Sequence, residues 1–160
     1  MSPSRKDWLI AIRPWSFPAS TMPALVTISY VFYLNSVTPL DVNWLYGVLA
    51  FFGAAFFQAS GNLISDYYDY LYTVDRKESF GSSRMLVDGV FKPKTILNYG
   101  LVFLVIGCLL GLFLLFKTSI HLLWIGAIGV LGTYFYYKMK YRALGDLNIF
   151  IIYGLCIALG

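Results

Sequence analysis

Charged and chemically reactive residues are scarce in this sequence of 160 residues. Asp, Glu, Lys and Arg make up 12% of it, and there are two cysteines and one histidine, whereas a soluble domain is about 25% charged. This scarcity excludes a disordered chain and an ordinary soluble enzyme. The basic residues form no continuous run, which excludes a nucleic-acid-binding protein. Cys108 and Cys156 lie far apart within apolar stretches and are expected to be packing residues.

Apolar residues take the place of the missing charge, at 59% of the sequence. Four intervals lack Asp, Glu, Lys and Arg altogether, and they span residues 14–40, 42–65, 95–116 and 118–137. Because a membrane-spanning helix needs about 20 mostly apolar residues, the sequence predicts an all-α, polytopic membrane helical bundle. We expect four complete transmembrane helices, at about 17–35, 43–64, 95–116 and 119–137. The apolar run at 146–160 is expected to begin a fifth helix that continues in a longer protein.

The distribution of positive charge predicts the orientation of the bundle. Lys and Arg gather before the first expected span, between the second and third, and between the fourth and fifth. Since loops rich in Lys and Arg stay on the cytoplasmic side, the N-terminus and the interval 66–94 are expected to be cytoplasmic. We therefore expect a multi-pass protein of the cell inner (cytoplasmic) membrane.

Several other residues receive ordinary structural interpretations. Lys138, Lys140 and Arg142 are taken chiefly as determinants of orientation. Gln58, in the middle of an expected span, should face protein or a cavity, and it is a candidate for lining a substrate channel. Five glycines are spaced so that helices can approach closely, namely Gly107, Gly111, Gly126, Gly129 and Gly132.

Acidic residues open the interval 66–94, which we expect to be a cytoplasmic active-site loop. If the preceding helix continues for one or two turns, Asn62, Asp66 and Asp69 share one face, with Ser65 at its edge. Two carboxylates one turn apart repel each other, and a bound cation removes that repulsion. Carboxylates without His or Cys suit Mg²⁺. These acids, with Asp75 shortly after, are candidate metal ligands.

Basic and aromatic residues accompany these acids. The basic ones are suited to holding a diphosphate, and they are Arg76, Lys77, Arg84, Lys92 and Lys94. Acids for a metal, bases for phosphate and a bilayer for a lipid tail together predict an enzyme that acts on a membrane-embedded diphosphate ester. A solvated loop of mixed charge is the alternative. Against it, the acids begin on the helix itself and lie beside four tyrosines, Tyr67, Tyr68, Tyr70 and Tyr72.

Three separated segments resemble the UbiA superfamily of intramembrane prenyltransferases. Residues 61–75, with Ser83-Arg84-Met85-Leu86-Val87-Asp88-Gly89, resemble the first aspartate-rich motif of that family. Residues 13–20 resemble the entrance to its first helix, and residues 143–147 the start of its fifth. Within the superfamily, the sequence looks most similar to the 1,4-dihydroxy-2-naphthoate polyprenyltransferases of menaquinone biosynthesis. The resemblance covers nearly the whole chain as the N-terminal part of a fold of about nine helices around a central cavity.

The resemblance implies Mg²⁺-dependent transfer of a polyprenyl group from polyprenyl diphosphate to an aromatic acid. With 1,4-dihydroxy-2-naphthoate as the acid, the product is demethylmenaquinone. The resemblance also implies that Asp66, Asp69 and Asp75 bind Mg²⁺ and that Arg84 contacts the diphosphate. Relatives often have Asn where this chain has Ser65, so either Ser65 or Asn62 would supply a neutral oxygen. A second aspartate-rich motif is expected from the missing C-terminal half, without which the fragment is expected to be inactive.

The remaining substrate contacts and the competing functions stay open. Arg13 is a candidate for the carboxylate of the acceptor, and an interfacial anchor is its equal alternative. Lys77 and Tyr68 complete the expected substrate-binding set, since an aromatic face stabilises an allylic cation. Other acceptors are 4-hydroxybenzoate, homogentisate, a chlorophyllide or haem. The alternatives from other classes are half of an ion-coupled transporter and a non-catalytic fragment or scaffold.

Overall fold

A computed structural model describes residues 3–76 and 82–160, and within these ranges it contains helices and no strand. The expected all-α class is thereby confirmed for the described residues. In chain order the elements are α1 (Arg5–Ala11), η1 (Pro14–Ser16), α2 (Pro18–Val37), α3 (Trp44–Leu71), α4 (Pro93–Lys117), α5 (Leu122–Tyr141), α6 (Gly145–Ile149), the π-helical η2 (Phe150–Cys156) and α7 (Ile157–Leu159).

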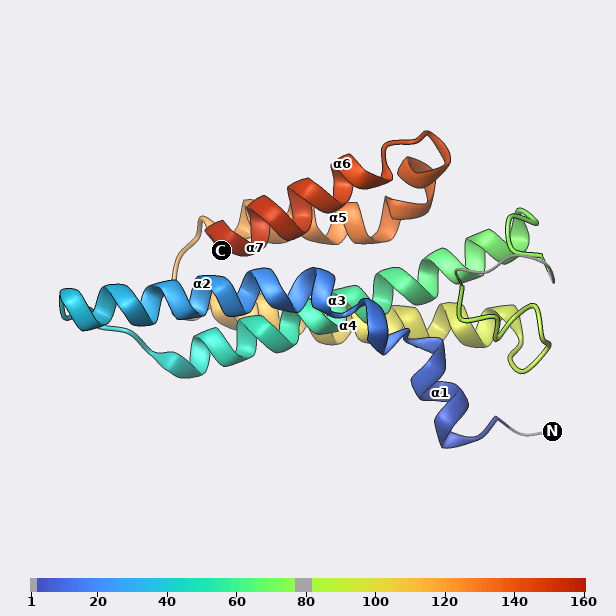
Figure 1. Ribbon diagram of the computed structural model, residues 1–160, viewed down its shortest axis with the longest axis horizontal. Coiled ribbons are helices and arrows are strands. Elements are labelled where there is room, and N and C mark those ends of the chain that lie inside the picture. Colours follow the sequence, from blue (N-terminus) through green and yellow to red (C-terminus); the bar gives the residue numbers. More distant parts are fainter. Residues whose placement is uncertain (1–2, 77–81) are drawn as a thin grey trace.

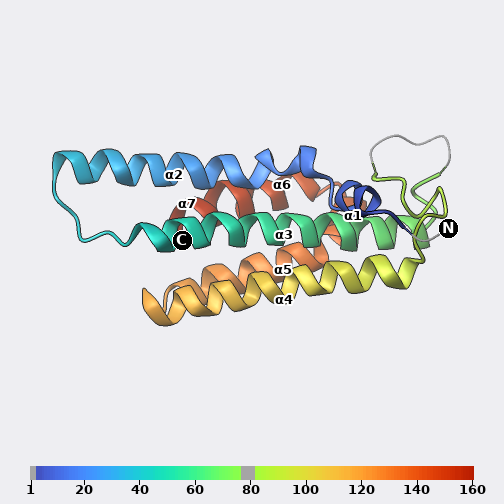
Figure 2. The ribbon, with the colours of Figure 1, turned by 90° about the horizontal axis from the view of Figure 1, so that it is seen from below.

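The long helices lie side by side along the long axis of the molecule (Figure 1). Helix α3 is central, because it packs against α2, α4 and α5, and Figure 2 shows it between α2 and α4. Helix α5 and the helical segment from α6 to α7 form a pair on one side of the bundle (Figure 1). The described parts of the connection between α3 and α4 lie at the same end of the bundle as α1.

Two helices, α3 and α4, are long and apolar enough to cross a membrane, and the pair formed by residues 5–16 and α2 makes a third if it is one span bent by 59°. The four complete spans expected from the sequence are therefore not confirmed by length and composition. Helix α5 has 20 residues, but its second half contains tyrosines and two lysines. The apolar helices are those of a membrane protein.

Helix α3 continues to Leu71, six residues into the interval 66–94 that was expected to be a loop. The helix persists because its last turns have a packed face, on which Leu63, Asp66 and Asp69 are buried. A helix of 28 residues is roughly 42 Å long, whereas the hydrocarbon core of a bilayer is about 30 Å thick. A membrane span therefore needs only part of α3, and the acids lie in its last turns.

Two residues with left-handed backbone conformation shape the ends of the helices near the acids. Arg13, with φ of 55°, separates α1 from η1. Thr73, with φ of 54°, follows the end of α3. The turn at Thr73 lets the backbone N–H groups of Val74 and Asp75 donate to the carbonyl of Asp69 at 2.9 and 3.2 Å. It thereby folds Asp75 back onto the helix that carries the other two acids.

The buried apolar core lies at this same end of the bundle. It joins α1, α3, the segment before α4, and α4 through Ala11, Leu63, Leu86, Phe91 and Ile96. Trp8 of α1 adds edge-on ring contacts to Phe91 and Tyr99, with ring centroids 4.5 and 4.7 Å apart. The core thus holds α1 and residues 83–91 against the end of α3 where the acids are.

The glycines differ in how closely neighbouring elements approach them. At Gly107 an added Cβ would lie 3.2 Å from the ring of Phe57, and at Gly132 it would overlap Ile152. At Gly111, Gly126 and Gly129 the same atom would meet nothing within 4 Å. The expected close approach therefore occurs at two of the five predicted glycines.

Candidate active site

Three carboxylates converge at the end of α3. Asp66 and Asp69 lie one turn apart on the helix and are 3% and 1% exposed, and the turn at Thr73 brings in Asp75, which is partly exposed. One carboxylate oxygen of each residue lies within 4.8 Å of those of the other two. The structure therefore brings together the three residues that the sequence suggested as metal ligands, and we call them the acidic cluster.

Asp66 is held from two directions. Arg13 forms an ion pair with its Oδ1 through Nη2, and the two side chains are 14% and 4% exposed. Ser83 donates to Oδ2 from its hydroxyl at 2.6 Å and from its backbone N–H at 3.3 Å. Asp66 therefore ties two segments to α3, namely the break between α1 and η1 and the segment that contains Ser83.

Asp69 has a different set of donors. Lys140 donates to Oδ2 at 2.7 Å, Tyr141 donates to Oδ1 at 2.7 Å, and Ser65 donates to Oδ2 at 3.2 Å. Burial raises the pKa of Tyr141, and its hydrogen bond to Asp69 raises that pKa further, so the phenol remains a donor at neutral pH. Lys140, taken from the sequence as an orientation determinant, also takes part directly in the acidic cluster.

Asn62 lies one turn before Asp66 and contacts other groups. Its Nδ2 donates to the carbonyl of Ile12 at 2.9 Å and to the hydroxyl of Ser16 at 2.8 Å. Asn62 therefore fixes α3 to the broken start of α2, whereas Ser65 supplies the neutral side chain that contacts Asp69.

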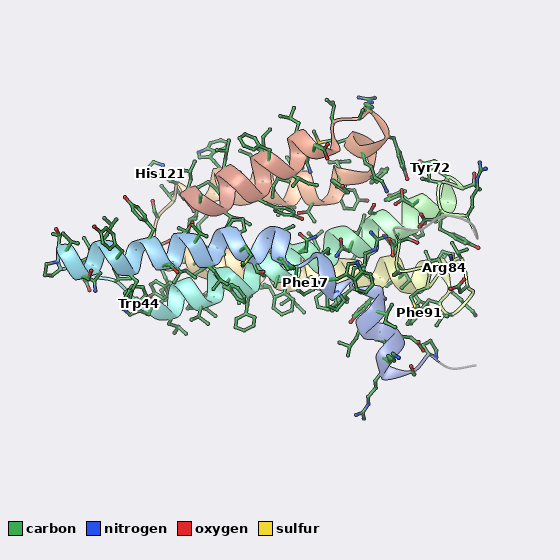
Figure 3. The ribbon with its side chains drawn as sticks, viewed as in Figure 1. Phe17, Trp44, Tyr72, Arg84, Phe91 and His121 are labelled. Atoms are coloured by element: carbon green, nitrogen blue, oxygen red, sulfur yellow. The ribbon has the colours of Figure 1, made fainter. Side chains whose placement is uncertain are left out.

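The other expected substrate residues have more varied positions. Arg84, in left-handed conformation with φ of 62°, forms an ion pair with Asp88 at 3.1 Å on the surface, at the end of the bundle opposite His121 and Trp44 (Figure 3). Tyr68 stacks on Tyr137, with ring centroids 3.6 Å apart. Lys77 lies outside the described residues.

Two adjoining cavities lie within the bundle. The first, which we call the polar recess, has a volume of about 250 Å³, and its lining includes Arg13, Ser16, Gln58, Asn62, Lys140 and Asn148. The second, the apolar cavity, has a volume of about 680 Å³ and is lined by residues of α2, α3, α4, α5, η2 and α7. Thr133, Ile152 and Tyr153 line both, so the two are neighbours within the bundle.

The acidic cluster, the polar recess and the apolar cavity are neighbours in the structure. Arg13 and Lys140 bind the acids and also line the polar recess, so the recess adjoins the acidic cluster. The recess in turn shares three lining residues with the apolar cavity. The site thus combines buried carboxylates, a polar recess and a largely apolar cavity.

Comparison with known sequences shows the family of this chain. Residues 15–160 match the model of the UbiA prenyltransferase family, and the chain belongs to that family. It is 34% identical to UbiA prenyltransferase domain-containing protein 1 of Rattus norvegicus and of Homo sapiens, in each case over 92% of this chain and 44% of the relative. It is 29% identical to the homolog in Drosophila melanogaster, over 93% of this chain and 42% of the relative.

The chain spans less than half the length of these curated relatives, and no solved structure matches it. The resemblance to the superfamily, inferred from three short segments, is confirmed. The narrower similarity to dihydroxynaphthoate polyprenyltransferases is not shown, because these relatives carry the name of a different member of the family.

Sequence reasoning did not predict the contacts that the acidic cluster makes with Arg13, Ser83, Lys140 and Tyr141. Ser83 stood in a segment of the resembled motif without a role of its own, Tyr141 had no motif, and Lys140 was counted with its basic neighbours. A usable signal was present, since Lys140 and Tyr141 close an apolar segment on the same expected side of the membrane as Asp69. Hydropathy predicts the side of the membrane on which these residues lie, but it does not predict which of several neighbouring residues faces Asp69.

Proposed function

We propose that the protein takes part in transfer of a polyprenyl group from polyprenyl diphosphate to an aromatic acid, most specifically 1,4-dihydroxy-2-naphthoate, to give demethylmenaquinone. The observation that supports this proposal is that the polar recess adjoins both other features: Arg13 and Lys140 line it and bind the acids, and three of its lining residues also line the apolar cavity. The diphosphate would lie at the acids, the aromatic acceptor in the recess and the tail in the apolar cavity.

The acidic cluster has the chemistry of a Mg²⁺ site. Asp66, Asp69 and Asp75 would hold the ion, since each offers a carboxylate oxygen within 4.8 Å of those of the other two and hard oxygen ligands suit Mg²⁺. When bound, Mg²⁺ neutralises the diphosphate and favours its departure as a leaving group. Arg13 and Lys140 already neutralise part of the acidic charge. They are also placed to attract the anionic head of the substrate.

The chain itself would protect the reacting carbon. Departure of diphosphate leaves an allylic cation, which must be kept from water until the aromatic ring attacks it. The lining of the larger cavity is largely apolar and so disfavours water, and aromatic faces stabilise a desolvated cation by up to about 2 kcal/mol. Arg13, which lines the polar recess, is the proposed partner for the carboxylate of the acceptor.

The proposal also covers the orientation of the protein in the membrane and the part of the site that this chain does not contain. We infer a multi-pass protein of the cytoplasmic membrane with four complete spans and with its N-terminus and acidic cluster on the cytoplasmic side. Lys138, Lys140 and Arg142 support this orientation through the excess of basic residues at that end. Since the curated relatives are more than twice as long as this chain, a C-terminal half would supply a second aspartate-rich motif.

The test uses membranes that contain the complete gene product, supplied with polyprenyl diphosphate, 1,4-dihydroxy-2-naphthoate and Mg²⁺. Wild type should release diphosphate in step with prenylated product, and Asp66→Ala or Asp69→Ala should reduce this turnover to background. Asp146→Ala is the matched control, because Asp146 is an exposed acid of α6 that lines neither cavity. Full turnover in both cluster variants would contradict the site. Turnover with only 4-hydroxybenzoate or homogentisate would change the acceptor, and ion-driven uptake without product would favour a transporter.

A further inference from the structure

Gln58 presents an unused hydrogen-bond acceptor inside the bundle. It lies on α3 two turns before Asp66, is 6% exposed, and lines the polar recess. Its Oε1 atom is buried and has no hydrogen-bond partner among the described residues. Buried polar atoms in folded proteins are almost always paired, so an unpaired oxygen on the wall of a polar cavity requires a donor from outside the described residues, which is an ordered water in the empty recess and a ligand group in the occupied one.

The surrounding hydrogen bonds fix which end of the Gln58 amide is unpaired. The carbonyl of Ile12 can only accept, so Asn62 must direct its Nδ2 toward it and keep its Oδ1 for Gln58. Gln58 therefore directs its Nε2 toward Asn62, at 3.4 Å.

Ser16 enforces the same orientation. Its hydroxyl donates to the carbonyl of Arg13 at 2.9 Å, which leaves its oxygen to accept from the amides of Asn62 and Gln58 at 2.8 and 3.3 Å. Because two backbone carbonyls set the direction of the whole network, rotating the Gln58 amide by half a turn would place its oxygen against two acceptors. Oε1 is thus the atom left for a ligand.

The chemistry of the substrates selects the ligand group. A diphosphate and an ionised carboxylate only accept hydrogen bonds, and a prenyl chain neither donates nor accepts them. A phenolic hydroxyl is the one donor among them. Building on the proposed function, we propose that Oε1 of Gln58 accepts a hydrogen bond from a ring hydroxyl of the aromatic acceptor. This contact fixes the orientation of the ring in the recess and selects hydroxylated acceptors over their ethers.

The test measures both turnover and binding in the complete gene product reconstituted in lipid, with 1,4-dihydroxy-2-naphthoate as the acceptor probe. Gln58→Met keeps the length of the side chain and removes the amide. It should raise KM for the acceptor by roughly ten- to a hundredfold, as expected for a buried hydrogen bond left unmade. KM for polyprenyl diphosphate should stay the same. Equilibrium binding of the acceptor without polyprenyl diphosphate should weaken by the same factor.

Two controls separate a ligand contact from a structural effect. Ser60 lies two residues further along α3, is 0% exposed, and also has an unpaired buried oxygen, but it lines neither cavity. Ser60→Ala should leave KM for the acceptor unchanged. On wild-type protein, one of the two mono-O-methyl ethers of the probe should bind about tenfold more weakly than the probe itself and should be insensitive to Gln58→Met.

The outcomes distinguish this inference from the proposed function. If wild type binds the probe but forms no prenylated product, the proposed function fails while the binding comparison still decides the role of Gln58. Unchanged acceptor affinity in Gln58→Met overturns the inference, and so does equal binding of the probe and both ethers to wild type. A rise in KM for both substrates alike would also overturn it, since that result indicates a structural role.

Discussion

The ion pair between Arg13 and Asp66 offers the sharpest test of how the acidic cluster is built. Arg13→Met keeps most of the side-chain volume and removes the guanidinium, which leaves a carboxylate that is 4% exposed facing one donor residue fewer. Removing one partner of a buried ion pair costs about 3–5 kcal/mol. For a protein of this size each kcal/mol shifts Tm by about 2–4 °C, so the expected loss is roughly 6–20 °C.

A divalent cation should recover much of this loss. Without Arg13, the three carboxylates of the cluster repel one another more strongly, and Mg²⁺ at 100 times its Kd contributes about 2.7 kcal/mol. Thermal unfolding of the purified protein in detergent, with and without Mg²⁺, measures both effects. Arg5→Met is the control, since Arg5 is exposed on α1 near the same end of the bundle. The reasoning is refuted if Arg13→Met loses no more stability than Arg5→Met, or if Mg²⁺ stabilises Arg13→Met no more than wild type.

Two further predictions concern other parts of the structure. Gly100→Ala places a Cβ 3.1 Å from atoms of Leu63 and Ile64 and should destabilise the packing of α3 on α4 by about 1–3 kcal/mol. Gly111→Ala meets open space and should be neutral or stabilising by up to about 1 kcal/mol. Equal midpoints of denaturant unfolding for the two variants would contradict this prediction. Tyr141→Phe removes a donor to Asp69 and should weaken Mg²⁺-dependent turnover, so that a higher Mg²⁺ concentration is needed for half-maximal rate. An unchanged Mg²⁺ titration would show that the phenol has no role in the cluster.

The parts of the fold that the sequence predicted are those governed by hydropathy and by local spacing. Uncharged intervals located α2, α3, α4 and α5 to within a few residues of their apolar parts, because a long apolar run has few alternatives to a buried or membrane helix. The spacing of Asn62, Asp66 and Asp69 predicted a shared face provided that the helix continued. It does continue, to Leu71.

The contacts that complete the site could not be predicted in this way. Arg13 reaches Asp66 across 53 residues, and Lys140 reaches Asp69 across 71. Such pairings depend on the left-handed turn at Arg13 and on how α5 packs against α3. Hydropathy also gave no sign that Arg84 would pair with Asp88, because a motif resemblance places a residue in a segment without fixing where its side chain points.

The buried cluster formed by Ala11, Leu63, Leu86, Phe91 and Ile96 lies beside the acids and not at mid-height of the long helices. Many apolar side chains farther along α2 and α4 are exposed on the outside of the bundle. A thinner bilayer, or a short-chain surfactant, therefore acts first on the far ends of these helices, where tilt can absorb hydrophobic mismatch. The geometry around Asp66 and Asp69 should consequently be insensitive to lipid chain length, even where the apolar cavity narrows or widens with it.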